Sequence, residues 1–538
     1  MIKIKNSILG VGLAFASLTT FTGCIDETQP TDIATSEQVS QSAAAVEGLV
    51  MAMPAFFNNL NETFYTPNNY HFNFGYGSMI RIRATLTEPF VTPGSGYDWF
   101  APWAENEGIN QDAARSNFVW TYYYKFIQTA NNVLSTINEE TDEQKGYIAA
   151  AKAFRALAYL DLGRMYEYLP TDVTKGVNAD GNDVTGLTVP IVKEGMAETD
   201  ARNNPRVKKE DLIKFIKEDL EYAEQNIGKL TKTAKTLPHL DCVYGLEARL
   251  YMWEGDYAKA QAAAENAIKT SSVQPMTQAQ CLNTTTGFNN LADFMWGSQQ
   301  TSEDVVVSTG IINWISFMCN EQTFGYCGAG TGDYIRIDTL AYTRLNDTDF
   351  RKLEWVAPAG SPIADKVSFV NKTYGASMPP MASVKFRPNQ GEMDAPSVAA
   401  ATAFPVMRVE EMYYIRIEAA AQQDAAKGKE LLELFMKTRD PKYTCKATSK
   451  EDIIKEIYFQ KSIDLWGEGI TFFDMKRLNY SLTRGYHGTN HSVGARINTN
   501  GRPATTNFLF YRTEAENNTA LKGWNNPDPS GKYPLWTE

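Results

Sequence analysis

Apolar residues recur with helical spacing in several separate stretches of the chain. Residues 208–227 have the spacing of an amphipathic helix, and residues 142–168 are rich in alanine, a strong helix former. The stretches expected to be helical are 46–60, 116–137, 142–168, 208–227, 239–269, 409–434 and 450–478. The pattern therefore predicts a mainly α-helical fold.

Residues 239–269 carry the spacing of a tetratricopeptide helix pair. Small residues where two helices would cross allow close packing, and Gly255 with Asp256 predicts the turn between them. Because one pair cannot bury its apolar face alone, we expect more pairs beside it. The predicted architecture is a tetratricopeptide-like helical repeat scaffold with long irregular loops and a few short strands. Its repeats are expected over about 116–270 and 405–480.

Three long segments lack a sustained period. Residues 61–115 and 481–538 are irregular by pattern, with many Asn, Gly, Pro and aromatic residues in the first. The insert at 271–405 contains short β-prone runs at 304–308, 367–370 and 383–386. Loops this long in a folded chain are usually functional, so we expect ligand contacts there.

The N-terminus predicts export and a lipid anchor. Lys3 and Lys5 precede a weakly apolar run at 8–21, which is shorter than the ~20 residues that span a bilayer and is typical of a signal peptide. Gly23-Cys24 then resembles a bacterial lipobox, with Cys24 as the lipidated residue. We expect a signal peptide over 1–23, a flexible tether over 24–42 and a single domain over 43–538. An ordinary cleavage site beside an incidental cysteine is the alternative.

Composition narrows the chemistry. The 538-residue chain has 43% hydrophobic residues, a formal net charge of −12 and only four His. A net negative chain is a poor partner for nucleic acid. His487 and His491 have a metal-binding spacing but no Glu follows the first of them, so we expect no metal and no cofactor. Cys319 and Cys327 either bridge a loop or remain free, buried thiols.

Three segments together carry a family resemblance. They are AKAFRALAYLDLGRMY at 151–166, FPVMRVEEMYYIRIEAA at 404–420 and IYFQKSIDLWGEGI at 457–470 with FDMKRL at 473–478. With the lipobox and the overall length, these segments resemble the SusD/RagB family of nutrient-binding outer-membrane lipoproteins. Gln460-Lys461 stands where the family usually has Glu-Arg.

The resemblance implies a function as well as a SusD-like fold. It implies a non-enzymatic protein, lipid-anchored on the outer membrane and facing the cell surface. Such a protein passes an oligosaccharide or oligopeptide to a SusC-like TonB-dependent transporter. The aromatic loops favour a glycan over a peptide.

Four tryptophans in the loops are the predicted ligand-binding residues. In the family, loop aromatics from an early segment and from the central insert hold the ligand, and a Trp face can stack on a sugar ring. The predicted residues are Trp99, Trp103, Trp296 and Trp314. Each of them could instead attach its loop to the scaffold, because Trp is highly buried on average.

Two further functions stay open on the residues alone. Glu410 and Glu418 lie about two helical turns apart, and paired carboxylates at a suitable separation could serve a surface-anchored glycosidase or protease. Charges on otherwise apolar helices more often cap helices or form ion-pair networks between repeats. The third hypothesis is a repeat scaffold that binds another protein through its concave face.

Overall fold

A computed structural model describes residues 42–60, 70–94 and 98–538 of the chain. The predicted signal peptide, Cys24 and the tether, apart from Ser42, lie outside the described residues. Ten helices form the main body of the described chain. They are α2 (Ala43–Phe56), α5 (Ala114–Thr136), α6 (Asp142–Tyr166), α8 (Lys209–Asn226), α9 (Leu240–Glu254), α10 (Tyr257–Thr270), α17 (Val409–Gln423), α18 (Ala425–Met436), α19 (Lys450–Asp464) and α20 (Thr471–Arg477).

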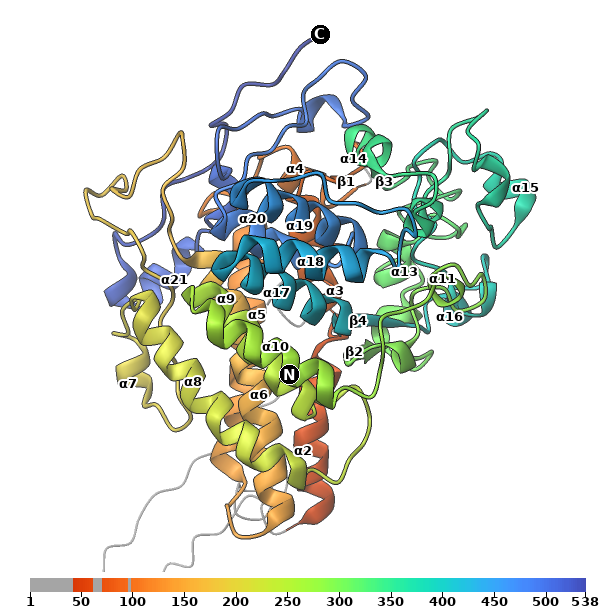
Figure 1. The fold of residues 1–538 in the computed structure, drawn as a ribbon. Coiled ribbons are helices and arrows are strands. Elements are labelled where there is room, and N and C mark those ends of the chain that lie inside the picture. The colour runs from red at the N-terminus through yellow and green to blue at the C-terminus, as the bar shows by residue number, and fades with distance from the viewer. Residues whose placement is uncertain (1–41, 61–69, 95–97) are drawn as a thin grey trace, which may run out of the picture.

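These helices pack in a continuous series, and the predicted repeat scaffold is confirmed. Helix α6 packs against α5 and α8, α9 packs against α8 and α10, and α10 packs against α17. Helix α17 then contacts both α18 and α19. Figure 1 shows this series running from α5 and α6 in orange through green α9 and α10 to the blue helices α17 to α20.

The turn between α9 and α10 has the predicted geometry. Gly255 ends α9 with a φ of 89°, a left-handed conformation that glycine adopts without a steric penalty. The Asp256 side chain accepts a hydrogen bond from the Lys259 backbone N–H and so caps α10. Small side chains of α10 are buried where it meets its neighbours, and they are Ala260, Ala263, Ala264 and Ala267.

The remaining described helices are short. They are α3 (Tyr76–Thr85), α4 (Ala101–Ala104), α7 (Glu198–Ala201), α11 (Gln278–Cys281), α12 (Val305–Ser308), α13 (Trp314–Met318), α14 (Thr339–Arg344), α15 (Lys372–Gly375), α16 (Pro396–Ala399) and α21 (Arg512–Asn517). Those of the insert gather beside the scaffold, on the right in Figure 1. Residues 481–538 contain α21, short 3₁₀ turns and isolated bridges in the described structure, and they are largely irregular, as the pattern predicts.

In the described part of the chain, four short strands form two antiparallel pairs. Strand β1 (Phe90–Val91) pairs with β3 (Arg336–Ile337), and β2 (Trp296–Gln299) pairs with β4 (Ala403–Met407). The second pair ties both ends of the insert together, directly before α17. The strand predicted at 304–308 is wrong, because Val305–Ser308 is helix α12. Residues 367–370 form no strand, and 383–386 contribute only an isolated bridge at Ser383.

Helix α3 lies where the sequence predicted irregular structure. All ten of its residues are buried, including Arg81 and Arg83. A helix that is buried on every side has no polar face, so it lacks the amphipathic period on which the prediction depended. Among the described residues, no helix is both long enough and apolar enough to cross a membrane.

Candidate functional site

Three of the four predicted tryptophans are buried in the hydrophobic core. Trp103 is 3% exposed, and Trp296 and Trp314 are 0% exposed. Trp296 lies on β2, where its indole N–H donates a hydrogen bond of 3.1 Å to the Thr236 carbonyl. Its ring packs edge-on against Phe154 at a centroid distance of 5.0 Å. A side chain in this position joins a strand to the scaffold.

Trp314 and Trp103 have equally closed surroundings. Trp314 packs against Phe386 and Phe404 at centroid distances of 5.4 and 5.2 Å. Trp103 packs edge-on against Phe72 at 5.4 Å. The prediction that Trp103, Trp296 and Trp314 stack on ligand is therefore corrected. Each of them attaches a loop to the core, because removing its apolar surface from water lowers the free energy of the folded state.

Trp99 differs from the other three because it is only half-buried. Its ring stacks on His71 at a centroid distance of 5.0 Å with an interplanar angle of 27°. Tyr70 meets it edge-on at 6.3 Å. His71 also contacts Tyr326, whose hydroxyl forms a short hydrogen bond with the His71 Nδ1. We call these four half-buried residues, Tyr70, His71, Trp99 and Tyr326, the aromatic cluster.

The aromatic cluster joins two distant parts of the sequence. Tyr70, His71 and Trp99 come from the early segment that contains α3 and α4, and Tyr326 comes from the central insert. Tyr326 stacks on Phe317 at 4.7 Å with an interplanar angle of 6°, and Phe317 stacks on Phe74 at 5.3 Å. The half-buried aromatic cluster therefore packs on the buried rings of Phe317 and Phe74.

Buried polar groups hold the Tyr326 loop in place. The Tyr326 backbone N–H donates to the Ser316 hydroxyl at 3.0 Å. The side chain of buried Gln322 accepts from the backbone N–H of Phe324 at 2.7 Å. Gly328 has a φ of 81°, and a Cβ there would lie 2.2 Å from the Asn320 carbonyl oxygen, so only glycine fits this turn. The loop is thus fixed before any ligand arrives, which lowers the entropic cost of binding.

A buried ion pair holds the other side of the cluster. Asp98, next to Trp99, accepts from the Arg81 guanidinium at 3.3 Å and from the Phe100 backbone N–H at 2.9 Å. Arg81 itself is 0% exposed and lies 4.5 Å from the centre of the Phe90 ring. Burial lowers the pKa of Arg81 and raises the pKa of Asp98, and each ion partly offsets the shift of the other.

The aromatic cluster carries no net charge at neutral pH. Burial lowers the pKa of His71 from its usual 6.5, so the imidazole is neutral at pH 7. Tyrosine and tryptophan rings offer apolar faces and polar edges. This chemistry suits an uncharged ligand with hydroxyl groups, such as a sugar, better than an anion.

The carboxylates considered for acid–base catalysis form ion pairs with Arg and Lys side chains. Glu410 is 0% exposed and lies 2.8 Å from Arg408, and Glu418 is 2% exposed and pairs with Arg477 at 2.5 Å. Asp474 contacts both Lys461 and Arg477, at 2.7 and 2.8 Å. The Glu418–Arg477 pair joins α17 to α20 and the Lys461–Asp474 pair joins α19 to α20, whereas Arg408 and Glu410 lie together at the start of α17.

Asp464 is the centre of the largest network. It contacts Arg439 at 3.0 Å, Arg408 at 3.5 Å and Arg351 at 3.8 Å, and all three cations are buried. Burial alone would raise the pKa of Asp464, but Arg439, Arg351 and Arg408 hold the pKa below its usual value. The network therefore stabilises the ionised carboxylate and fixes the scaffold instead of exposing a reactive acid.

The described residues form neither a metal-binding cluster nor a disulfide. No group of three metal-ligating His, Cys, Asp or Glu side chains occurs among them. His491 is buried 3.5 Å from Asp338, and His487 packs edge-on against Trp536 at 5.5 Å. Cys319 and Cys327 are both buried and free, so the disulfide alternative does not hold in this structure.

Comparison with known proteins decides the family. A sequence model described as starch-binding, associating with the outer membrane, matches residues 33–252, and a second described as the SusD family matches residues 344–528. The chain belongs to the SusD/RagB family. No curated protein sequence matches the chain.

Solved structures confirm the SusD-like fold. A SusD-like carbohydrate-binding protein from Bacteroides vulgatus has a TM-score of 0.68 at 19% identity, over 90% of this chain and 98% of its own. Surface glycan-binding protein A from Bacteroides uniformis has a TM-score of 0.60 at 14% identity, over 89% and 99%. A laminarin-binding SusD-like protein has a TM-score of 0.58 at 14% identity, over 88% and 97%. At these identities the likeness shows the fold alone.

The departure from the SusD/RagB pattern at 460–461 has a structural explanation. Lys461 supplies a positive charge at the position where the family usually has Arg, and its ammonium lies 2.7 Å from Asp474. Gln460 accepts from Arg351 at 2.5 Å through its side-chain oxygen and donates to Glu456 at 2.8 Å through its nitrogen. A neutral amide can make both contacts, whereas an ionised glutamate could only accept.

Sequence reasoning missed Tyr70 and His71 as site residues. They lie in the run Tyr70-His-Phe-Asn-Phe74, whose aromatic density resembles that of the segment around Trp99. Tyr326 belongs to the aromatic, glycine-containing loop of the insert. What the sequence could not show is that 70–74, 98–100 and 326 meet in space.

Proposed function

We propose that the chain is a non-enzymatic surface lipoprotein that binds an oligomeric nutrient and delivers it to a SusC-like TonB-dependent outer-membrane transporter. A glycan is the preferred ligand, and an oligopeptide is the alternative. The lipid on Cys24 would hold the protein to the outer membrane, on the cell surface.

The aromatic cluster is the observation that carries this proposal. In a family of nutrient-binding proteins, it places the half-buried faces of Trp99 and Tyr326 beside a neutral His71, on a rigid base. Ring faces stack on the C–H faces of sugars, and their polar edges can meet hydroxyl groups. The Bacteroides proteins of similar fold include a carbohydrate-binding and a glycan-binding protein, which favours a glycan here.

The state of the carboxylates supports a carrier over an enzyme. Glu410, Glu418 and Asp474 are themselves buried, and each of them contacts a cation. A glycosidase needs two carboxyl groups that face the scissile bond, one of them free to give up a proton. The ion pairs named here leave these three carboxylates unsuited to that role.

Calorimetric titration of the full chain in detergent against neutral polysaccharides, acidic polysaccharides and peptide mixtures tests the proposal. Products would be assayed in the same samples. Saturable binding of a neutral glycan without turnover is the expected result. Turnover would contradict the non-enzymatic function. The absence of a binding signal with every ligand would favour the protein-binding scaffold.

A test of the transporter partner uses the same preparation. The lipidated chain should co-purify with a TonB-dependent transporter when it is isolated from mild detergent extracts of its own outer membrane. Replacement of Cys24 by Ser should release the chain from the membrane fraction. Recovery of the Cys24→Ser chain in that fraction would contradict the lipid anchor.

A further inference from the structure

We propose that a groove between α14 and α19 is a second saccharide site that takes a neutral oligosaccharide. The groove has a volume of about 670 Å³, which lies in the usual range for small-ligand sites. Its walls come from α14, α19, the residues before β1 and the segments at 478–481 and 500–501. It shares no lining residue with the aromatic cluster, so the inference goes beyond the proposed function and does not depend on it.

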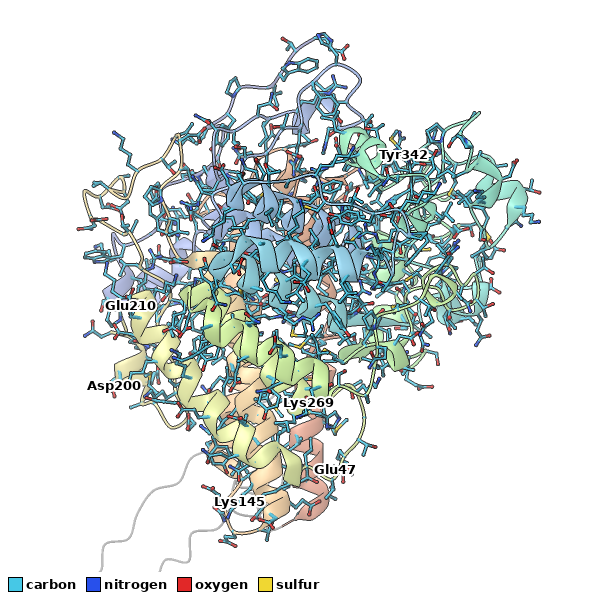
Figure 2. The ribbon with its side chains drawn as sticks, in the orientation of Figure 1. Glu47, Lys145, Asp200, Glu210, Lys269 and Tyr342 are labelled. Atoms are coloured by element: carbon cyan, nitrogen blue, oxygen red, sulfur yellow. The ribbon has the colours of Figure 1, made fainter. Side chains whose placement is uncertain are left out.

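The groove lies far from the end of the scaffold where α2 begins. Figure 2 shows Tyr342 on α14 near the top of the molecule, whereas Glu47 on α2 and Lys145 on α6 lie at the lower end. Its lining includes Leu340, which is 51% exposed on α14. An exposed leucine beside a deep groove offers apolar area to a ligand.

Two tyrosines form an angled apolar wall. Tyr458 on α19 and Tyr480 after α20 are both half-buried, and their ring centroids lie 5.0 Å apart at an angle of 68°. Rings at this angle present two faces in different directions to a ligand in the groove. Tyrosine rings of this kind stack on the C–H face of a sugar and keep a hydroxyl at the edge for hydrogen bonding.

Polar groups on the walls remain available to a ligand. Among the described residues, none forms a hydrogen bond with the Tyr480 hydroxyl or with the side-chain amide of Asn500. The Asn479 side-chain oxygen accepts from the Arg502 backbone N–H at 3.1 Å, which leaves the amide N–H groups to donate. Hydroxyl and amide groups of this kind match the donors and acceptors of a sugar.

The charges of the lining exclude an anionic ligand. Arg344 already pairs with Glu456 and lies 3.7 Å from the centre of the Phe459 ring. Lys455 lies 2.7 Å from Glu451. Because both cations of the lining have carboxylate partners, a phosphate or an acidic sugar would find no free positive charge there. Glu88 also lines the groove, and in its ionised state it would repel an anion.

Glu88 can serve a neutral ligand in either protonation state. Its carboxylate accepts from the Thr483 backbone N–H at 2.6 Å, and burial raises its pKa to about 7. Near neutral pH the group can accept or donate a hydrogen bond to a sugar hydroxyl. An extended peptide would gain less, because recognition of that kind needs the edge of a sheet, and β1 and β3 have only two residues each.

The wall made by α14 is fixed in advance. Asp338 caps this helix by accepting from the Ala341 backbone N–H at 3.0 Å, and Tyr486 donates a short hydrogen bond to the same carboxylate. The Asp338 backbone N–H donates to the Pro89 carbonyl at 3.0 Å, so α14 is tied to the residues before β1. A groove with fixed walls loses little entropy when a ligand binds.

Saturation-transfer NMR on the full chain in detergent tests the groove separately from the aromatic cluster. The probes are laminarihexaose, maltohexaose, xylohexaose and mannohexaose, with an acidic hyaluronan hexasaccharide and trialanine for comparison. The starting protein carries Trp99→Ala, which weakens the aromatic cluster. We expect at least one neutral hexasaccharide to receive saturation from this protein, and neither the acidic sugar nor the peptide.

Groove variants in the Trp99→Ala protein then locate the signal. Tyr480→Ala should weaken the remaining binding about tenfold, the loss expected for one stacked ring. Leu340→Glu, at an exposed position where folding is not at risk, should weaken it as well. Trp524→Ala is the matched control, because Trp524 is 37% exposed and lines neither site.

Each outcome separates the two sites. If Trp99→Ala abolishes all saccharide binding, the groove proposal is overturned and the aromatic cluster is supported. If Trp99→Ala binds like the wild type and Tyr480→Ala does not bind, the groove is supported and the aromatic cluster fails. Neutral-sugar binding that survives both groove variants, or a preference for the acidic probe, would also overturn the groove proposal.

Discussion

The helical scaffold and the loops around the aromatic cluster bury different kinds of side chain. In the scaffold, many buried side chains are charged and have ionic partners, as Asp464 has in Arg439 and Arg408. In the central insert, many of the large buried side chains are aromatic, as Trp296 and Trp314 are. Residue type alone therefore does not mark a site: charges here serve packing, and most loop tryptophans do too.

The comparison also shows what distinguishes a site residue. Trp99 has the same side chain as Trp314, yet it is half-buried and its neighbours are also half-exposed aromatic residues. A ligand can reach such a cluster, whereas Trp314 is 0% exposed. Partial exposure on a rigid base, and not aromatic content, is the property that separates the two.

Removal of the central carboxylate of the scaffold should have the largest effect. In Asp464→Ala, the buried cations Arg439, Arg408 and Arg351 lose a shared partner. We expect a loss of about 3–5 kcal/mol in the free energy of unfolding, measured by urea denaturation, because the network loses a carboxylate that compensates its buried positive charge.

An exposed ion pair is the control for that variant. Glu430 pairs with Lys427 at 3.0 Å, but its side chain is 67% exposed. Glu430→Ala should change the free energy of unfolding by less than ~1 kcal/mol. If both variants cost the same, the scaffold network is not the stabilising element described here.

Truncation of a buried loop tryptophan should destabilise the chain without a direct effect on binding. Trp314→Ala removes a ring that packs against Phe386 and Phe404. We expect a loss of about 3–5 kcal/mol in the free energy of unfolding by the same measurement. Glycan affinity of the fraction that remains folded should stay near that of the wild type. A selective loss of affinity with unchanged stability would place Trp314 in the binding site after all.

A glycine substitution should connect loop geometry to binding. Gly328→Ala introduces a Cβ that would lie 2.2 Å from the Asn320 carbonyl oxygen at a φ of 81°. We expect a cost of about 1–3 kcal/mol from backbone strain and a weaker glycan affinity, because the Tyr326 loop must shift. Gly228→Ala is the control, since no atom lies within 4 Å of its Cβ position. Equal affinities in the two variants would mean that Tyr326 does not contact the ligand.

Much of the scaffold could be predicted from the sequence, because its helices are either amphipathic, as α8 is, or rich in helix formers, as α6 is, and its turns carry recognisable residues. Gly255 and Asp256 show this at the α9–α10 turn. Helix α3 could not be predicted, because burial on every side removes the polar face that reveals a surface helix. The valines of 304–308 favour a strand by propensity, but residues Val305–Ser308 form helix α12 in their tertiary context.

The candidate site was only partly predictable. Trp99 was found from its aromatic, Pro-rich and Gly-rich surroundings, whereas the exposure that separates it from Trp103 depends on packing between distant segments. Tyr326 lies more than two hundred residues from His71, and their hydrogen bond is a tertiary contact that no local pattern encodes.

Glycan titration of three matched proteins tests the central claim most directly. The proteins are the wild type, Trp99→Ala and Trp524→Ala, each titrated by calorimetry with a glycan that the wild type binds. We predict that Trp99→Ala weakens the affinity about tenfold or more while Trp524→Ala leaves it unchanged, with all three proteins equally stable to urea. Equal affinity of all three would contradict the assignment of the aromatic cluster as the ligand site.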